Sequence, residues 1–463
     1  MMSAPVLSII ILAVMFILAT LLPLNMGALA FVGAFLLGAV FLGMETADIL
    51  ANFPGGLFLT IVGVTYLFAI AQNNGTIDLL VRGAVRMVGN RVGLIPWVMF
   101  SITALITSVG ALSPAAVAII APIALNFAGK YKISPLLMGM MVIHGAQAGG
   151  FSPIAVYGVT VNGILEQTTL ESNPTALFLA SLAFNVMIAA VLFLVLGGRT
   201  LVNARVGDFV EQAAEARLSA SVGIRAAGDV TFKGFGSGIY GPRDPAGTAA
   251  IATSPDTEPT ATRGERIGQI VTIAGLIALA VVALGFSVDV GFVSITIAII
   301  LALVSPKAQK GAVNKISWST VLLICGMLTF VGVLQEAGTI EYVSDGVAQL
   351  GMPLLAALLI CYIGAVVSAF ASSTAILAAL IPLAVPFLAT GEIGAVGVIC
   401  ALAVSSTIVD VSPFSTNGAL VLANAPDEVN KEKFYKQILG YSGIVVVAGP
   451  AIAWLILVVP GWL

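Results

Sequence analysis

Long apolar runs, separated by short polar segments, follow one another along the whole chain. Runs of about 20 residues are long enough to cross a bilayer as helices. Two other apolar stretches, 95–128 and 352–389, are interrupted in the middle, and we expect both to form re-entrant hairpins that enter the membrane without crossing it. We predict crossings near residues 5–22, 26–43, 55–73, 135–165, 175–197, 267–286, 289–304, 317–335, 393–424 and 437–459.

The interruptions recur at matching places in the two halves of the chain. A Ser-Pro pair at 152–153 returns 260 residues later at 412–413, and Gly158 returns as Gly418 at the same distance. Paired interruptions of this kind are typical of secondary transporters built from internal repeats, and they mark the binding site. Because the first half contains an odd number of crossings, the second half should begin on the opposite side of the membrane.

We therefore predict an all-α polytopic membrane protein with an inverted repeat of five spans in each half. Each repeat contributes one re-entrant hairpin and one discontinuous helix. The N-terminal membrane repeat covers 1–198 and the C-terminal inverted membrane repeat covers 267–463. The segment between them, 199–266, is rich in Ala, Gly, Ser, Thr, Pro and charged residues, and we expect a flexible linker. A small folded cap is the alternative.

All 19 Lys and Arg residues fall on one side of the predicted membrane. They lie in 82–91, 130–132, 199–266, 307–315 and 431–436. The opposite side carries acids, including Glu45, Glu166 and Glu336, and no basic residue. The positive-inside rule makes the basic side cytoplasmic, which predicts a cytoplasmic linker with both termini outside. Two amphipathic segments, 75–90 and 338–350, are expected to lie along opposite membrane faces at the root of each hairpin.

Composition excludes several classes of protein. Only 9% of the residues are charged and 59% are hydrophobic, whereas a soluble domain carries roughly 25% charge. The three cysteines, Cys325, Cys361 and Cys400, lie in apolar runs without metal-ligand spacing, so we expect them to be packing residues. An intramembrane enzyme is disfavoured, because the predicted spans contain no His/Glu metal cluster, no Ser–Lys pair and no aspartate pair. A channel is disfavoured because nothing resembles a charged ring or a repeated carbonyl filter.

The predicted breaks at 112–114, 149–153, 372–374 and 409–413 carry the candidate chemistry. Helix N-termini at a break favour an anion and helix C-termini favour a cation. Because no Lys or Arg lies within any predicted span, an anionic substrate would be held by helix ends, hydroxyls, amides and bound cations. For each single hydroxyl the alternative is an ordinary bond back to a membrane helix. The polar side chains at the breaks are Ser113, Ser152, Ser372, Ser373, Thr374, Ser412, Ser415, Thr416 and Asn417.

Ser108 and Ser368 are also 260 residues apart, and each precedes its hairpin tip by about one helical turn. A hydroxyl there can face the tip carbonyls and complete an all-oxygen cage for a hard monovalent cation. Asp410 is the one acid at membrane depth, where a carboxylate costs about 2.5–3.5 kcal/mol, so we interpret it as a proton or cation site, with a helix-capping role as the alternative. His144 has no matching polar counterpart, and we expect a satisfied core histidine.

Four runs of the chain resemble a known family. They are PLNMGALAF at 23–31, GLIPWVMF at 93–100, HGAQAGGFSP at 144–153 and DVSPFSTNG at 410–418. On these runs the chain resembles a malonate/dicarboxylate carrier of the MatC type, within the ion-transporter superfamily that includes the divalent anion:sodium symporters. The resemblance implies a homodimeric elevator carrier. The symporters carry Ser-Asn-Thr at each hairpin tip; here the second tip, 372–374, is a near match, whereas the first, Leu112-Ser113-Pro114, lacks the Asn and Thr.

The resemblance also implies site residues by position. The first ion site would use Ser108, Ser113 and the carbonyl of Phe151. The second would use Ser368, Ser373 and the carbonyls of Ala371 and Val411. Substrate contacts would come from Ser113, Pro114, Ser152, Pro153, Ser373, Thr374, Ser412, Pro413, Thr416 and Asn417.

These observations together predict a secondary active transporter, not an enzyme, that imports a small dicarboxylate, malonate or a C4 acid. Its partners would be the dicarboxylate, a coupling cation (Na+ or H+) and the lipid bilayer, with no nucleic acid and no cofactor other than that ion. We expect a multi-pass protein of the bacterial inner (plasma) membrane. The alternative is an antiporter or an oxyanion exporter of the same superfamily, although a proton-driven antiporter usually needs paired intramembrane acids.

Overall fold

The computed structural model describes residues 3–202 other than 88, 90, 167 and 169, then 204–205, 263–285, 288–339, 342–343, 352–369, 373–389, 391, 393–426 and 429–461. Most of the predicted linker, from 206 to 262, lies outside these residues. So does the predicted second amphipathic segment from 344 onward, and so do Ala371 and Ser372 of the second hairpin tip.

The regular secondary structure of the described residues is helical and includes no strand; an isolated β-bridge joins Arg91 and Arg205. In the first half the elements are α1 (Ala4–Leu21), α2 (Met26–Phe35), the π-helical η1 (Leu36–Leu42), α3 (Thr46–Ala51), α4 (Gly55–Asn73), α5 (Thr76–Met87), η2 (Val92–Leu94), α6 (Ile95–Ser108), α7 (Ser113–Lys130), α8 (Pro135–Gly150), α9 (Val156–Leu165), α10 (Pro174–Val195) and α11 (Gly198–Leu201). In the second half they are α13 (Arg263–Gly285), α14 (Val290–Val304), α15 (Pro306–Gln309), η3 (Val313–Lys315), α16 (Trp318–Glu336), α18 (Pro353–Ser368), α19 (Ser373–Ala389), α20 (Ala395–Ile408), η4 (Val409–Val411), α21 (Thr416–Ala423) and α22 (Lys431–Leu457).

The lengths and hydropathy of the helices agree with a chain that crosses a membrane several times. Among the described residues, 6 helical segments are long and apolar enough to span it, and the others that were predicted as crossings are shorter apolar helices. Many begin with a proline in the first turn, as α8 does at Pro135 and α10 at Pro174, because proline lacks the N–H that the first turn leaves unpaired. Asn173 caps α10, with its side-chain oxygen accepting from Ala176 N.

The breaks differ by a few residues from those predicted. At the first hairpin the chain leaves the helix at Val109 and re-enters it at Ser113, so the break is 109–112 and not 112–114. Pro114 explains the difference, because proline favours the first turn of a helix over the turn that precedes it. The first discontinuous helix breaks at 151–155, between α8 and α9.

Elements of the two halves correspond at a nearly constant distance along the chain. Helices α7, α8 and α9 begin at residues 113, 135 and 156, and α19, α20 and α21 begin at 373, 395 and 416, each 260 residues later. Helix α16 likewise follows α4 by 263 residues at both ends. The predicted pairing of breaks is therefore present in the helix boundaries themselves.

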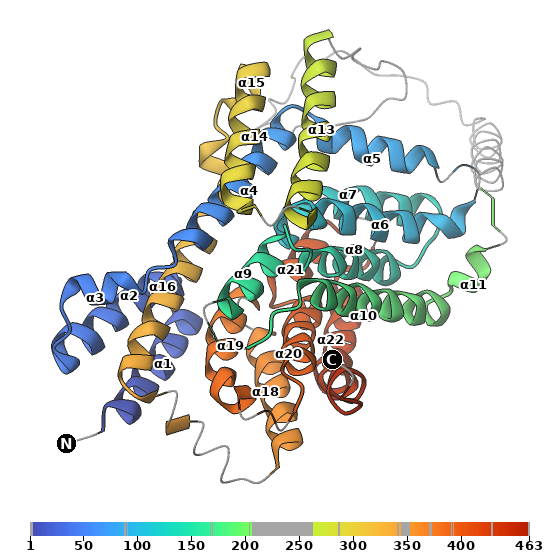
Figure 1. Cartoon of the computed structure of the whole chain (residues 1–463). Coiled ribbons are helices and arrows are strands. Elements are labelled where there is room, and N and C mark those ends of the chain that lie inside the picture. The colour runs from blue at the N-terminus through green and yellow to red at the C-terminus, as the bar shows by residue number, and fades with distance from the viewer. Residues whose placement is uncertain are drawn as a thin grey trace, which may run out of the picture.

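Corresponding helices of the two halves also pack against helices of the opposite half in the same way. Helix α14 packs on α4 while α16 packs on α2, and α21 packs on α7 while α19 packs on α9. In Figure 1, α1–α3 lie beside α16 at one end of the molecule, and the other end is built by α6–α10 together with α18–α22. Helices α8 and α20 are buried almost throughout and form the centre of this second group.

Two left-handed glycines end the long helices that precede the hairpins. Gly75 (φ 74°) follows α4 and Gly338 (φ 69°) follows α16. The buried threonine after each glycine is hydrogen-bonded. Thr339 Oγ1 lies 2.6 Å from Ser8 Oγ of α1, while Thr76 is linked to Thr272 of α13 by the side chain of Asn74, at 2.6 Å on each side. The end of α4 at Gly75 is thus hydrogen-bonded to α13, and the end of α16 at Gly338 is hydrogen-bonded to α1.

Candidate functional site

The two discontinuous helices bring their breaks into the centre of the fold. Helix α8 contacts both α20 and η4. An added Cβ at Gly158 would lie 2.0 Å from the carbonyl oxygen of Ser152, and one at Gly418 would lie 2.0 Å from the carbonyl oxygen of Ser412. No side chain fits in such a gap, so glycine at these two positions lets α9 and α21 restart directly against the broken segment.

Asp410 is the centre of a buried polar group built from four elements, η4, α19, α18 and α8. Its Oδ1 accepts a hydrogen bond from Ser373 Oγ at 2.8 Å, and its Oδ2 accepts one from Gln147 Nε2 at 3.0 Å. Ser368 Oγ donates to Ser373 Oγ at 2.9 Å, which joins the two arms of the second hairpin. The carboxylate is 8% exposed. We call Asp410, Ser373, Ser368 and Gln147 the Asp410 cluster.

Tyr157 on α9 completes one wall of the Asp410 cluster. It lies near Asp410, Ser373 and Thr374, close enough for its side chain to interact with theirs electrostatically, and α9 packs against α19. Its ring packs against Phe151, with centroids 5.4 Å apart. Tyr157 therefore links the first discontinuous helix to the tip of the second hairpin.

The helix-capping role considered for Asp410 belongs to Ser415 instead. Ser415 is the N-cap of α21, and its Oγ accepts from Gly418 N. The same Oγ lies 2.5 Å from the carbonyl oxygen of Asp410 and 2.7 Å from that of Ser412. The Asp410 carboxylate is thus left to bind side chains of other elements.

The first hairpin tip is arranged differently from the second. Ser113 Oγ accepts a hydrogen bond from Asn417 Nδ2 at 2.8 Å, so the tip is joined to the discontinuous helix of the other half. Ser108 Oγ donates to the carbonyl oxygen of Leu105 in its own helix at 2.8 Å. Ser368 and Ser373 are therefore in contact, whereas the hydroxyls of Ser108 and Ser113 bind other partners.

The remaining predicted residues are grouped around the breaks. Ser152 Oγ and Ser412 Oγ each accept from the backbone N–H two residues later, at 3.5 and 3.2 Å. Thr416 is exposed. Phe151, Thr374, Val411 and Pro413 are buried, and Pro114 and Pro153 are half-buried.

His144 is a satisfied core residue, as predicted. Its Nδ1 lies 2.9 Å from Asn185 Oδ1 and its Nε2 lies 2.7 Å from Tyr441 OH. Because the Asn185 oxygen only accepts, the neutral ring donates from Nδ1 and accepts the tyrosine proton at Nε2. All three cysteines are free and buried, which agrees with a packing role.

Sequence reasoning overlooked Gln147 and Tyr157. Tyr157 could have been found, because it stands 260 residues before Asn417 and each of the two contacts the hairpin tip of the opposite half. Gln147 had no such signal, since its counterpart is Thr407, which only bonds back within α20.

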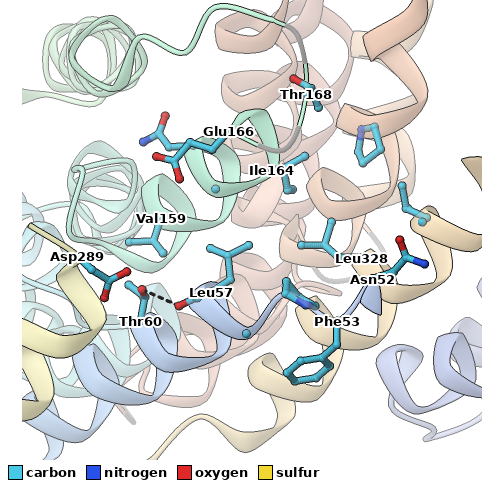
Figure 2. Close-up of a pocket in the computed structure, with 18 of the residues that line it drawn as sticks. Asn52, Phe53, Leu57, Thr60, Val159, Ile164, Glu166, Thr168, Asp289 and Leu328 are labelled. Carbon is cyan, nitrogen blue, oxygen red and sulfur yellow. Dashed lines mark hydrogen bonds between the residues drawn. The ribbon is translucent and has the colours of Figure 1, made fainter. Parts of the chain in front are cut away.

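A cavity of about 1370 Å³ lies beside the first break. Residues of α4, α14 and α16 line it on one side, and residues of α9 and α19 line it on the other. Figure 2 shows Leu57, Thr60, Val159 and Leu328 around it. Pro153, next to Ser152 of the first break, is part of the lining. The cavity therefore reaches the first break at Pro153, and the residues of the Asp410 cluster are not part of its lining.

Comparison with known proteins agrees with these observations. Residues 2–150 match the family model described as the N-terminus of the dicarboxylate carrier protein MatC. No curated protein matches the chain significantly. Among solved structures the chain is similar to the YdaH transporter of Alcanivorax borkumensis, described as having an unusual topology. The TM-score is 0.57 at 15% sequence identity, and the match covers 91% of this chain and 89% of that one.

The resemblance to the MatC-type dicarboxylate carriers is therefore confirmed over the N-terminal 2–150. The fold is that of a membrane transporter, and the chain is a multi-pass membrane protein.

Proposed function

We propose that the protein is a secondary active transporter that imports a small dicarboxylate, malonate or a C4 acid, together with a cation. The observation that carries this proposal is the Asp410 cluster at the meeting point of the broken helices. Among the described residues the carboxylate is hydrogen-bonded by neutral side chains, Ser373 and Gln147. A charge buried at membrane depth is retained mainly for function, and it needs a proton or a metal cation to balance it.

The coupling ion and the substrate would then assist each other. A cation held by Asp410 and the oxygens of the second tip supplies the positive charge that the predicted spans lack. A dianion bound beside it, at Thr374, Ser412 and the helix N-termini, gains from that charge, so the two ligands should bind cooperatively. Gln147 Oε1 and Asn417 Oδ1 have no hydrogen-bond partner among the described residues, and such open acceptors suit a cation better than an anion.

Transport by this fold would follow an elevator mechanism in an inverted-repeat homodimer. The packing of helices against the opposite half supports the inverted repeat. The cavity between α4, α14 and α16 on one side and α9 and α19 on the other supports a movable boundary there. The proposed orientation places the basic residues and linker in the cytoplasm of a bacterial inner membrane, with both termini outside. The cavity, lined by Glu166 and Asp289, would then open outward.

Uptake of labelled malonate and succinate into proteoliposomes tests this function, with an inward sodium gradient and an inward proton gradient imposed separately. We expect malonate or succinate to accumulate under at least one gradient. The absence of uptake of both diacids under both gradients contradicts the proposal, and accumulation driven by exchange against an internal diacid would favour the antiporter alternative.

Ser373→Ala tests the assignment of the site. The variant removes the hydroxyl that binds Asp410, and because a hydrogen bond to a charged group contributes about 1.5–3 kcal/mol, the half-saturating concentrations of substrate and cation should both rise roughly tenfold or more. Ser442→Ala is the matched control, since Ser442 is also buried but only bonds back within α22. Unchanged half-saturation in Ser373→Ala would contradict the site.

A further inference from the structure

The polar group around His144 continues to the Asp410 cluster. Asn185 accepts a hydrogen bond from His144 Nδ1 and donates through its own Nδ2 to the carbonyl oxygen of Ser181, at 2.9 Å each. Ser181 Oγ then donates to the carbonyl oxygen of Gln147 at 3.1 Å, and the side chain of Gln147 donates to Asp410. Helix α10, which carries Asn185 and Ser181, runs beside α8, which carries His144 and Gln147 (Figure 1). We call His144, Asn185 and Ser181 the His144 network.

The three side chains of the His144 network are fully buried and fully paired. Each is 0% exposed. Both ring nitrogens of His144 are hydrogen-bonded, the second one to Tyr441 OH of α22. Both polar atoms of the Asn185 side chain and the Ser181 hydroxyl also have partners. A satisfied buried network holds its helices in one arrangement, because hydrogen bonds are directional and apolar contacts are not. The network therefore fixes α8 relative to α10 and α22.

The second half builds the corresponding helix pair with apolar residues. The residues 260 positions after His144 and Asn185 are Val404 and Val445, and both are buried. Helix α20 nevertheless packs on α22 as α8 packs on α10. Polar side chains at these two positions are therefore not needed for the helix pair to pack.

Helix α8 differs from α20 in the residue that binds Asp410. Gln147 donates to the carboxylate, whereas its counterpart Thr407 bonds back within α20. Ser181 and Tyr441, at the two ends of the hydrogen-bonded chain, are also 260 residues apart, and each binds a group of α8. Both halves therefore direct a side chain onto the helix whose own side chain contacts Asp410.

The His144 network acts on the backbone of α8 at Gln147 itself. The Ser181 hydroxyl binds the Gln147 carbonyl in the last turn of α8, where the intrahelical hydrogen bonds end. Gln147 Nε2 lies 3.0 Å from Asp410 Oδ2, so a displacement of about 0.5 Å would take the pair out of hydrogen-bonding range. The side-chain amide of Asn185 and the peptide carbonyl of Gln147 do not take up and release protons. The network therefore positions groups and does not conduct protons.

We propose that His144, Asn185 and Ser181 are positioning residues that hold the Gln147 amide against the Asp410 carboxylate. A hydrogen bond to a carboxylate is stronger than one to the neutral acid, so Gln147 stabilises the charged form of Asp410. The His144 network thereby controls how readily Asp410 exchanges a proton or a cation. The assignment rests on the proposed function only for the consequence of that exchange in transport.

The rate at which an apolar carbodiimide modifies Asp410 in the purified full-length protein tests this role without any transport. The reagent reacts with a protonated carboxyl, so loss of the Gln147 N–H should speed the reaction. We expect Gln147→Met to react roughly tenfold faster, and Asn185→Leu and Ser181→Ala roughly threefold or more, by mass spectrometry of the peptide that contains Asp410. Thr103→Val is the matched control, since Thr103 is buried in α6, which also packs on α8, and only bonds back within its own helix. An unchanged rate in Asn185→Leu and Ser181→Ala overturns the proposal.

A double-mutant cycle separates positioning from a loosened fold. In a Gln147→Met background the His144 network has no amide to position, so adding Asn185→Leu should change the modification rate less than twofold. Loosened packing would instead multiply the two rate increases. Multiplicative effects therefore overturn the positioning role.

Uptake by Asn185→Leu connects the His144 network to the coupling ion. For whichever of sodium or protons drives uptake, the half-saturating ion concentration should change roughly threefold or more while the maximal rate is largely kept. A lower maximal rate with unchanged half-saturation would overturn the connection to the ion. If the carbodiimide results are as expected but no diacid is carried, the positioning role stands and the proposed function is wrong.

Discussion

Asp410 combines burial with an absence of charged partners among the described residues. Its two carboxylate oxygens accept from Ser373 and Gln147, and neither donor can neutralise it. Three different elements supply these groups, namely η4, α19 and α8. A proton or cation that enters or leaves this position changes the charge of the whole cluster, and with it the contact between the second hairpin and the first discontinuous helix.

Replacing Asp410 by Asn removes the negative charge of the side chain and keeps its shape. Asn keeps an acceptor for Gln147, and the Ser373 hydroxyl can rotate to accept from its NH2 group. The variant should therefore fold at least as stably as the wild type, because it no longer buries a charge, while uptake loses its cation dependence. Thermal unfolding in detergent and cation titration of uptake measure the two effects. Wild-type cation dependence in Asp410→Asn would assign the carboxylate a structural role.

At the scale of elements, both discontinuous helices use a glycine to pack closely against their own break. Gly158 of α9 and Gly418 of α21 each lie against the carbonyl of the serine that begins the Ser-Pro break. The close approach restarts the helix while its N-terminal N–H groups remain near the break, where they can bind an anion. The residue directly before each glycine, Tyr157 or Asn417, then lies near the opposite hairpin tip, and Asn417 is hydrogen-bonded to Ser113.

An added methyl group at either glycine should therefore displace the break. We expect Gly158→Ala and Gly418→Ala each to lower the melting temperature and to abolish uptake, because the new Cβ would overlap a backbone oxygen. Gly443→Ala in α22 is the matched control: no atom lies within 4 Å of its added Cβ, and the change should stabilise the helix by roughly 0.5–1 kcal/mol. Normal uptake by both break variants would contradict this account.

At the scale of the whole molecule, the two halves depend on each other for burial. Helix α4 of the first half packs on α14, and α2 packs on α16. The helix ends at Gly75 and Gly338 are each hydrogen-bonded to the opposite half, through Thr272 and Ser8 respectively. Neither half would bury its apolar faces alone, so we expect the two to fold as one cooperative unit.

The proposed orientation has a direct test by labelling. Cysteines introduced at Glu171 and Lys307, both exposed, should react from opposite sides of the membrane with a membrane-impermeant thiol reagent. In intact cells we expect Glu171→Cys to be labelled and Lys307→Cys to be protected until the membrane is opened. The background should be low, because the native cysteines are buried. Labelling of Lys307→Cys in intact cells, with Glu171→Cys protected, would invert the orientation.

The sequence by itself determined the apolar helices and the approximate places where they break. Crossings predicted at 55–73 and 289–304 correspond to α4 and α14 within one residue. Such features are local: a run of apolar residues or a proline in a first turn acts within a few positions of the chain. The same local chemistry supplied the serines of the breaks and singled out Asp410, which the structure buries.

The tertiary structure alone decided which of these groups meet. Gln147 and Asp410 are 263 residues apart, and their hydrogen bond exists only because α8 passes beside η4. Likewise, the hydroxyls of Ser368 and Ser373 are in contact, whereas Ser113 binds Asn417 of the other half. Glu166 and Asp289 line one cavity because α9 and α14 both lie against α4. These pairings depend on how two helical halves cross, and no spacing within a single helix encodes that crossing.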